Sequence, residues 1–349
     1  MSADPQTPPP ATATATATST ATATASPAKL QTAIDSLSSI VPALSTLTPS
    51  NLLTNPDLYS NISALLRQPN SGAGDNNLCR WLYDTFQSGV ADLQLLVLRF
   101  LPVIAGVYLS RVADRKPQAG FEAVLLALYA HETTSRAGQP VSITIPDLTQ
   151  PSVYHEATGK SPSKSTGAAE SDLAVVSHAL EPHGTVRSTR RARIVGVALE
   201  LYYTKIAHMP ISSKIDFCEF CKVWAGQEGE MYEKFEEDEE ENEEGGVGSA
   251  MEVKVRKKVE GRVPLCWELL QPVMRILAHC LLGPNNNKEV VLFEKANEAC
   301  RSLFARSMHD VNPKAILPMR SLMRLSKTLM PNSKHLDPTE LPYSDVISL

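Results

Sequence analysis

Residues 264–282 have the sequence PLCWELLQPVMRILAHCLL, and this stretch decides the fold class. Its polar residues Glu268, Gln271, Arg275 and His279 recur at spacings of three, four and four. That spacing places them on one narrow stripe of a helix whose other faces are apolar. A helix of this kind is mostly buried, so the pattern predicts a helix within a large helical core.

Helical patterns dominate the rest of the chain as well. N-capping signals, meaning a capping-type residue before proline or a capping box, occur at Ser26-Pro27, Asn55-Pro56, Asn312-Pro313 and Ser213–Asp216. Strand patterns are restricted to 141–145 and 251–255, which we consider as partners in a small hairpin. We therefore predict helices at 30–46, 56–67, 77–88, 92–113, 119–132, 172–180, 189–208, 213–225, 264–282, 288–309 and 314–330.

Low-complexity and polar segments flank and interrupt these helices. Residues 1–29 form an Ala/Thr/Pro-rich leader, 331–349 form a polar tail, and the linker 146–171 and the insert 226–262 separate helical stretches. Such residues bury too little apolar surface to offset their ordering entropy. We predict an all-α protein: one large irregular helical bundle over residues 30–330, with a disordered N-terminal tail, an acidic insert and a C-terminal tail.

The net charge of −5 combines two unlike parts of the chain. Eleven acids and one base lie between Glu228 and Glu244, which leaves a net charge of +5 for everything else. Acidic side chains at that density repel each other and favour a solvated segment. We hypothesise that this run screens the basic stretch Lys254–Lys258 or competes with acidic lipids for it, which deletion of residues 228–244 would test through vesicle binding.

Two apolar stretches, Leu93–Leu109 and Pro264–Leu282, resemble membrane spans in composition. The first is short and contains Arg99 and Pro102, and the second carries the polar stripe described above. A span needs about 20 mostly apolar residues without central charges. We therefore expect buried helices of a soluble protein. The absence of a signal-peptide pattern also favours a reducing compartment and argues against a disulfide framework for the six cysteines.

Two partial motifs lack the residues that their chemistry needs. Gly159-Lys160-Ser161 is similar to the end of a phosphate-binding loop, but Tyr154 stands where the first glycine belongs. His131-Glu132 begins like a zinc-protease helix, but the second histidine is missing, so two ligands cannot meet on one face. These fragments favour a flexible linker and a helix C-terminus respectively.

Cys218 and Cys221 form a single Cys-x-x-Cys pair. A structural zinc site needs four ligands, usually two such pairs. On a helix these thiols share a face with Phe217 and Trp224, which favours packing in a core. A metal site that uses both cysteines and a distant histidine remains the alternative, in which the chain is a soluble enzyme or a metal-binding helical protein. We predict no cofactor and no catalytic residue.

The helix at 314–330 carries the candidate binding residues. Arg320, Arg324 and Lys327 recur at i, i+4 and i+7, so they line one helical face. Leucine and methionine side chains, Leu322, Met323, Leu325, Leu329 and Met330, supply apolar surface elsewhere. A basic amphipathic helix can lie on an anionic membrane or bind an acidic partner, and the same pattern also fits an ordinary solvated face. The modest local charge and the lack of a recognised motif argue against nucleic-acid binding.

Three apolar segments, Asp92–Pro102 (DLQLLVLRFLP), Gly120–Tyr129 (GFEAVLLALY) and Arg193–Tyr203, resemble the hyccin family in content and order. The resemblance is good over residues 50–225 and looser to about 330. The Ala-Thr leader and the acidic insert resemble a plant-type member rather than animal members. We expect the first two segments to be buried core rather than an interface.

The resemblance implies a non-catalytic accessory subunit of the type III alpha phosphatidylinositol 4-kinase complex. It implies packing against a tetratricopeptide-repeat scaffold protein, and association with the phosphatidylinositol 4-kinase catalytic subunit and a lipidated membrane anchor. It also implies a location in the cytosol and at the cytoplasmic face of the plasma membrane. Contact with the anionic membrane would be indirect, through the complex, and a direct lipid contact through Arg320, Arg324 and Lys327 is a further alternative.

Overall fold

A computed structural model describes residues 19–42, 52, 55–113, 118–145, 172–182, 186, 190–226, 264–283 and 289–328. The helices and strands in chain order are α1 Ser19–Ile40, α2 Pro56–Arg67, α3 Asn77–Gln87, α4 Ala91–Arg99, α5 Leu101–Ala113, α6 Ala119–Ser135, β1 Val141–Ile145, β2 Asp172–Ser177, α7 Arg191–Thr204, α8 Ile211–Trp224, α9 Trp267–Leu282, α10 Val290–His309 and α11 Pro313–Thr328. A 3₁₀ turn, Ile206–His208, joins α7 to α8. The predicted all-α class is confirmed, with one small hairpin added to it.

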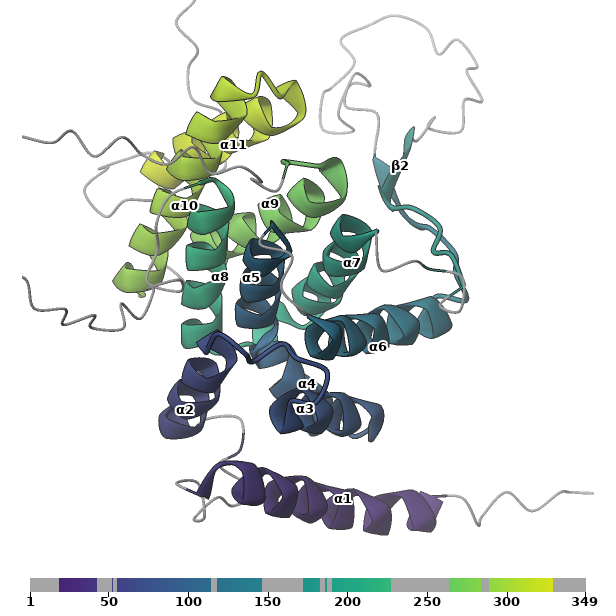
Figure 1. Cartoon of the computed structure of the whole chain (residues 1–349). Coiled ribbons are helices and arrows are strands. Elements are labelled where there is room, and N and C mark those ends of the chain that lie inside the picture. Colours follow the sequence, from purple (N-terminus) through teal and green to yellow (C-terminus); the bar gives the residue numbers. More distant parts are fainter. Residues whose placement is uncertain are drawn as a thin grey trace, which may run out of the picture.

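The helices surround a common apolar core (Figure 1). Helix α5 lies near the centre and packs against α8 and α7, while α9 packs against α7, α10 and α11. Helices α1 and α11 lie at opposite ends of the molecule in this view. The stripe predicted for 264–282 is confirmed: Gln271, Arg275 and His279 are half-buried and Glu268 is exposed, whereas most of the apolar residues between them are buried.

The segment 92–113, predicted as one helix, forms two. Helix α4 ends at Arg99 and α5 begins at Leu101, with a bend of 45° between them. Pro102 has no N–H to donate to the preceding turn, so it favours a new helix start at this point. In the described part of the chain no single helix is long and apolar enough to cross a membrane, although the bent pair α4–α5 meets that requirement on length and composition.

The predicted helix at 172–180 is wrong, because residues 172–177 form β2. This strand pairs antiparallel with β1, and Ile143 lies opposite Ala174. Adjacent β-branched residues, Val175 and Val176, favour the strand because cross-strand neighbours support it. The strand predicted at 141–145 is confirmed, whereas its considered partner at 251–255 lies outside the described residues.

Two of the N-terminal capping predictions are confirmed and two are wrong. The Asn55 side chain accepts hydrogen bonds from the backbone N–H of Asp57 and Leu58 at 2.8 and 3.2 Å, and α11 begins at Pro313 as predicted. Helix α1, however, begins at Ser19, before the predicted start at residue 30, and contains Pro27. Alanine is the strongest helix former, so the alanine-rich end of the leader continues the helix.

The capping box predicted at Ser213 is wrong because α8 begins two residues earlier, at Ile211. Ser213 is completely buried instead. Its hydroxyl donates to the backbone carbonyl of Arg99 at 2.6 Å and lies 3.0 Å from the Tyr202 hydroxyl. The serine therefore links α8 to the end of α4 and to α7. Residues 1–18, 146–171, the acidic run 228–244, Lys254–Lys258 and the tail 331–349 lie outside the described residues, and the predictions for them remain predictions.

Candidate interaction surface

Helix α11 presents the predicted basic residues to solvent. Arg320, Arg324 and Lys327 are all exposed. At about 100° per residue they fall within an arc of about 60° on the helix, and they span about 10 Å along its axis. None of the three makes an ion pair or a hydrogen bond with any residue that the structure describes. We call these three residues the basic face of α11.

The opposite side of α11 fixes the helix against the body. Ala315 and Met319 are fully buried, and Leu322 is nearly so. The Ser326 hydroxyl donates to the side-chain oxygen of Asn297 on α10 at 2.9 Å, which satisfies two buried polar groups at once. Packing of this side against α9 and α10 determines which side chains face outwards.

Both ends of the α11 surface carry features that the sequence analysis missed. Leu317 is 68% exposed and lies beside the basic face on the helical wheel. Leu325, which we predicted as apolar surface away from the basic face, is 48% exposed and lies on the far side of the same solvent-facing arc. At the first turn, the Lys314 ammonium lies 5.5 Å from the centre of the Trp267 ring, a cation–π contact with α9. The exposure of these side chains follows from how α11 packs against its neighbours, and the spacing of its charged residues alone does not predict it.

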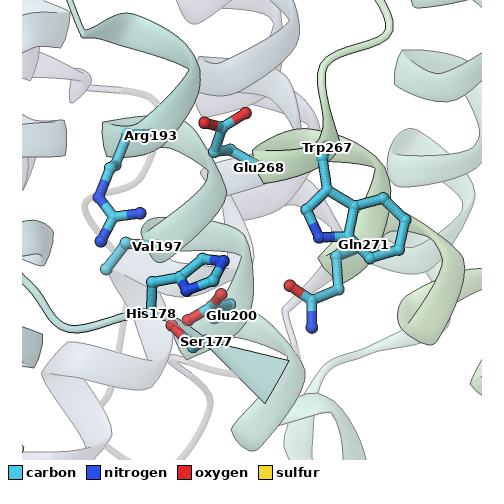
Figure 2. A pocket seen from close by; sticks show the side chains of 8 residues that line it. All are labelled: Ser177, His178, Arg193, Val197, Glu200, Trp267, Glu268 and Gln271. Carbon is cyan, nitrogen blue, oxygen red and sulfur yellow. The ribbon is translucent and has the colours of Figure 1, made fainter. Parts of the chain in front are cut away.

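A pocket between β2, α7 and α9 has polar walls but little room (Figure 2). Its volume is about 20 Å³, enough for about one water molecule and far below the several hundred Å³ of ordinary ligand pockets. It is lined by Ser177, His178, Arg193, Val197, Glu200, Trp267, Glu268 and Gln271. The pocket is therefore too small for an organic substrate.

Two charged groups at this pocket, Glu200 and Arg193, already have partners. The Arg136 guanidinium lies 3.2 Å from the Glu132 carboxylate and 3.6 Å from the Glu200 carboxylate, and it donates to the Ser177 hydroxyl at 2.8 Å. Burial raises the pKa of Glu200, and Arg136 and Ser177 oppose that change. The Arg193 guanidinium donates to the backbone carbonyl of Ala179. These contacts join α6, β2 and α7, so we interpret the cluster as structural.

A wider open groove of about 820 Å³ separates one side of α1 from α3. Helix α1 is held along this groove by two long-range hydrogen bonds: the Trp81 indole N–H donates to the carbonyl of Ala33, and the Lys29 ammonium donates to that of Ser88, both at 2.9 Å. Arg80 and Asp84 on its wall form an exposed pair at 3.9 Å, which contributes little to stability because water screens it.

Cys218 and Cys221 lie in the core, as their helical face predicts. Both are completely buried, and so is Phe217, while Trp224 is nearly buried. A hydrogen bond with Cys280 and burial raise the pKa of Cys218, and burial raises that of Cys221. The described residues contain no group of three or more His, Cys, Asp or Glu side chains that could hold a metal ion.

Purified full-length protein is expected to contain far less than one zinc ion per chain. A cysteine binds zinc as a thiolate, and the raised pKa of these buried thiols keeps them protonated at neutral pH. Elemental analysis before and after dialysis against a chelator measures the metal content. Stoichiometric zinc that is lost together with folding on chelation would contradict this expectation and restore the metal-site alternative.

A comparison with protein families extends the sequence resemblance to most of the chain. A sequence model of the Hyccin family matches residues 45–344, from just after α1 through α11 and beyond. The segments that carried the resemblance are structural: Leu93 and Leu96 on α4 and Phe121 and Tyr129 on α6 are buried. The match covers well over half of the chain and includes the basic face of α11, so the chain belongs to the hyccin family.

Proposed function

We propose that this chain is a non-catalytic scaffold subunit that stabilises a phosphatidylinositol 4-kinase complex and helps to recruit it to the plasma membrane. The family is one of accessory subunits of the type III alpha phosphatidylinositol 4-kinase complex, and the match over residues 45–344 carries the proposal. In this role the chain supports production of phosphatidylinositol 4-phosphate. Its location would be the cytosol and the cytoplasmic face of the plasma membrane.

The described structure supports a role through packing rather than through reaction chemistry. Titratable groups that are half-buried, such as Glu200 and Asp216, contact arginines that join separate helices. Asp216 on α8 accepts a hydrogen bond from Arg67 on α2 at 3.0 Å and another from the Tyr59 hydroxyl. A rigid helical body of this kind can stabilise a partner by binding its folded form alone, which shifts the folding equilibrium by mass action.

The partners of this chain would be a tetratricopeptide-repeat scaffold protein, the kinase catalytic subunit and a lipidated membrane anchor. Affinity purification of the tagged full chain from cells, followed by mass spectrometry, tests this directly. We expect the kinase and the repeat scaffold in amounts comparable to the tagged chain. Loss of the chain should also lower the amount of kinase and of phosphatidylinositol 4-phosphate at the plasma membrane, because a kinase complex that lacks this subunit is less stable.

The matched control is the chain with Gly196 replaced by valine, which should be strongly destabilised for reasons given in the Discussion. It carries the same tag and should recover much less of these partners. A purification of the native chain that contains no phosphoinositide kinase and no repeat scaffold would contradict the proposal.

A further inference from the structure

We propose that the basic face of α11, with its exposed leucines, binds an anionic lipid surface directly. This inference rests on the proposed function, because it assigns a membrane contact to a chain whose complex works at a membrane. It goes beyond that function by placing the contact on this chain and on one helix.

The charge of α11 fits an anionic surface. The helix Pro313–Thr328 contains Lys314 and the three residues of the basic face, and it contains no aspartate or glutamate. The three residues of the basic face lie within about 10 Å along the helix axis and point the same way, so their fields add at that surface. No carboxylate of the described residues forms an ion pair with them, so within this part of the chain their charge is not neutralised.

The apolar side chains on the same arc favour a lipid surface over an acidic peptide. Leu317 is 68% exposed and lies next to the basic face, whereas Leu325 is 48% exposed and lies about 100° around the helix from Arg324, on the far side of the solvent-facing arc. At the corner between α10 and α11, Met308 and Val311 are 51% and 78% exposed. A row of cations beside outward leucines is the pattern of helices that lie in a membrane interface, with the leucines inserted and the cations among anionic headgroups.

The position of α11 also suits a broad, flat ligand. The helix lies at one end of the molecule, away from α1 (Figure 1). Its inner side is held by α9 and α10, and neither of the two pockets described above is lined by it. A membrane surface can touch an exposed helix face along its length without a fitted cavity.

The test uses the full chain and vesicles of phosphatidylcholine with about 30% phosphatidylserine, beside vesicles of phosphatidylcholine alone. The test variant is Arg320→Glu together with Arg324→Glu. The control variant, Arg80→Glu together with Lys205→Glu, makes the same change in net charge at exposed positions on other parts of the body. All four side chains are exposed, so both variants should fold, which circular dichroism checks.

We expect the native chain and the control variant to bind the phosphatidylserine vesicles and not the neutral ones. Each basic residue near an anionic membrane contributes about fivefold to binding, so reversing two should weaken it by at least about 30-fold. Binding should also fall between about 50 mM and 500 mM salt because the ions screen the attraction. Replacing Leu317 by serine should weaken binding with no change in this salt dependence.

Equal binding of the native chain and the Arg320→Glu/Arg324→Glu variant would overturn the inference, and so would a native chain that ignores the phosphatidylserine vesicles. Co-purification separates this failure from failure of the proposed function. If the variant still recovers the kinase complex but loses the membrane fraction, the inference holds. If the variant loses the kinase complex itself, the basic face is a protein interface, and the inference fails while the proposed function stands.

Discussion

Replacing Arg111 by alanine is expected to lower the free energy of unfolding by about 3–4 kcal/mol, because it removes charge-assisted hydrogen bonds to buried acceptors. Arg111 on α5 is buried, at 8% exposure. Its guanidinium donates to the Ser71 hydroxyl oxygen at 2.9 Å and to the carbonyls of Arg67 and Gln68 at 2.9 and 2.6 Å. Those two carbonyls belong to the C-terminal end of α2, where helices leave acceptors without intrahelical partners.

Urea unfolding followed by circular dichroism measures this effect in the full chain. Arg111→Lys should recover only part of the loss, because an ammonium cannot serve the same divergent acceptors as a planar guanidinium. The matched control is Arg80→Ala, which removes an arginine whose side chain is 84% exposed, and it should change stability by less than about 1 kcal/mol. Equal unfolding midpoints for Arg111→Ala and Arg80→Ala would show that the α2 terminus does not depend on Arg111.

Replacing Gly196 by valine is expected to lower the free energy of unfolding by about 3 kcal/mol or more. Gly196 lies on α7 where this helix crosses the start of α9, and a Cβ atom there would collide with the backbone carbonyl of Glu268. The carbonyl carbon of Glu268 would lie only 3.1 Å away. Since the obstacle is backbone rather than a mobile side chain, the two helices must separate, at a cost of about 3 kcal/mol or more for valine.

The alanine variant provides a graded test. Alanine gains about 1 kcal/mol from helix propensity, so Gly196→Ala should still lose a net amount of about 2 kcal/mol. The control is Gly74→Ala, where the nearest atom to the new Cβ is the Ala119 Cβ at 3.4 Å, an ordinary contact. Thermal and urea unfolding of the three variants should place Gly74→Ala near the native chain. A Gly196→Ala variant as stable as the native chain would mean that α7 and α9 can move apart without loss.

Local signals in the sequence predicted those elements in which neighbouring residues determine the structure. The polar stripe of α9 and the capping role of Asn55 depend on residues within about one or two helical turns, so periodicity and residue type were sufficient. The exposure of Arg320 and Arg324 followed from the same logic, because a row of cations on an amphipathic helix faces solvent. What the basic face binds cannot follow from spacing alone.

The features that the sequence did not predict depend on residues far apart in the chain. The strand at 172–177 exists because β1 pairs with it across 26 intervening residues, and its one local signal, the pair Val175-Val176, is too short to distinguish a strand from a short helix. Ser213 has the spacing of a cap, but its buried hydroxyl serves the Arg99 carbonyl 114 residues away. Gly196 and Arg111 likewise acquire their importance only when α7 meets α9 and α5 meets the end of α2.

The buried cysteines of this chain make it possible to measure how often each part of the structure opens. Five of its six thiols are buried, and Cys266 is half-buried. A pulse of an alkylating reagent therefore labels the five buried thiols only when the structure around them opens. Cys218, Cys221, Cys280 and Cys300 on α8, α9 and α10 report on one end of the body, and Cys79 on α3 reports on the other. Comparing their labelling rates in the isolated chain and in the proposed complex would identify which end a partner holds closed.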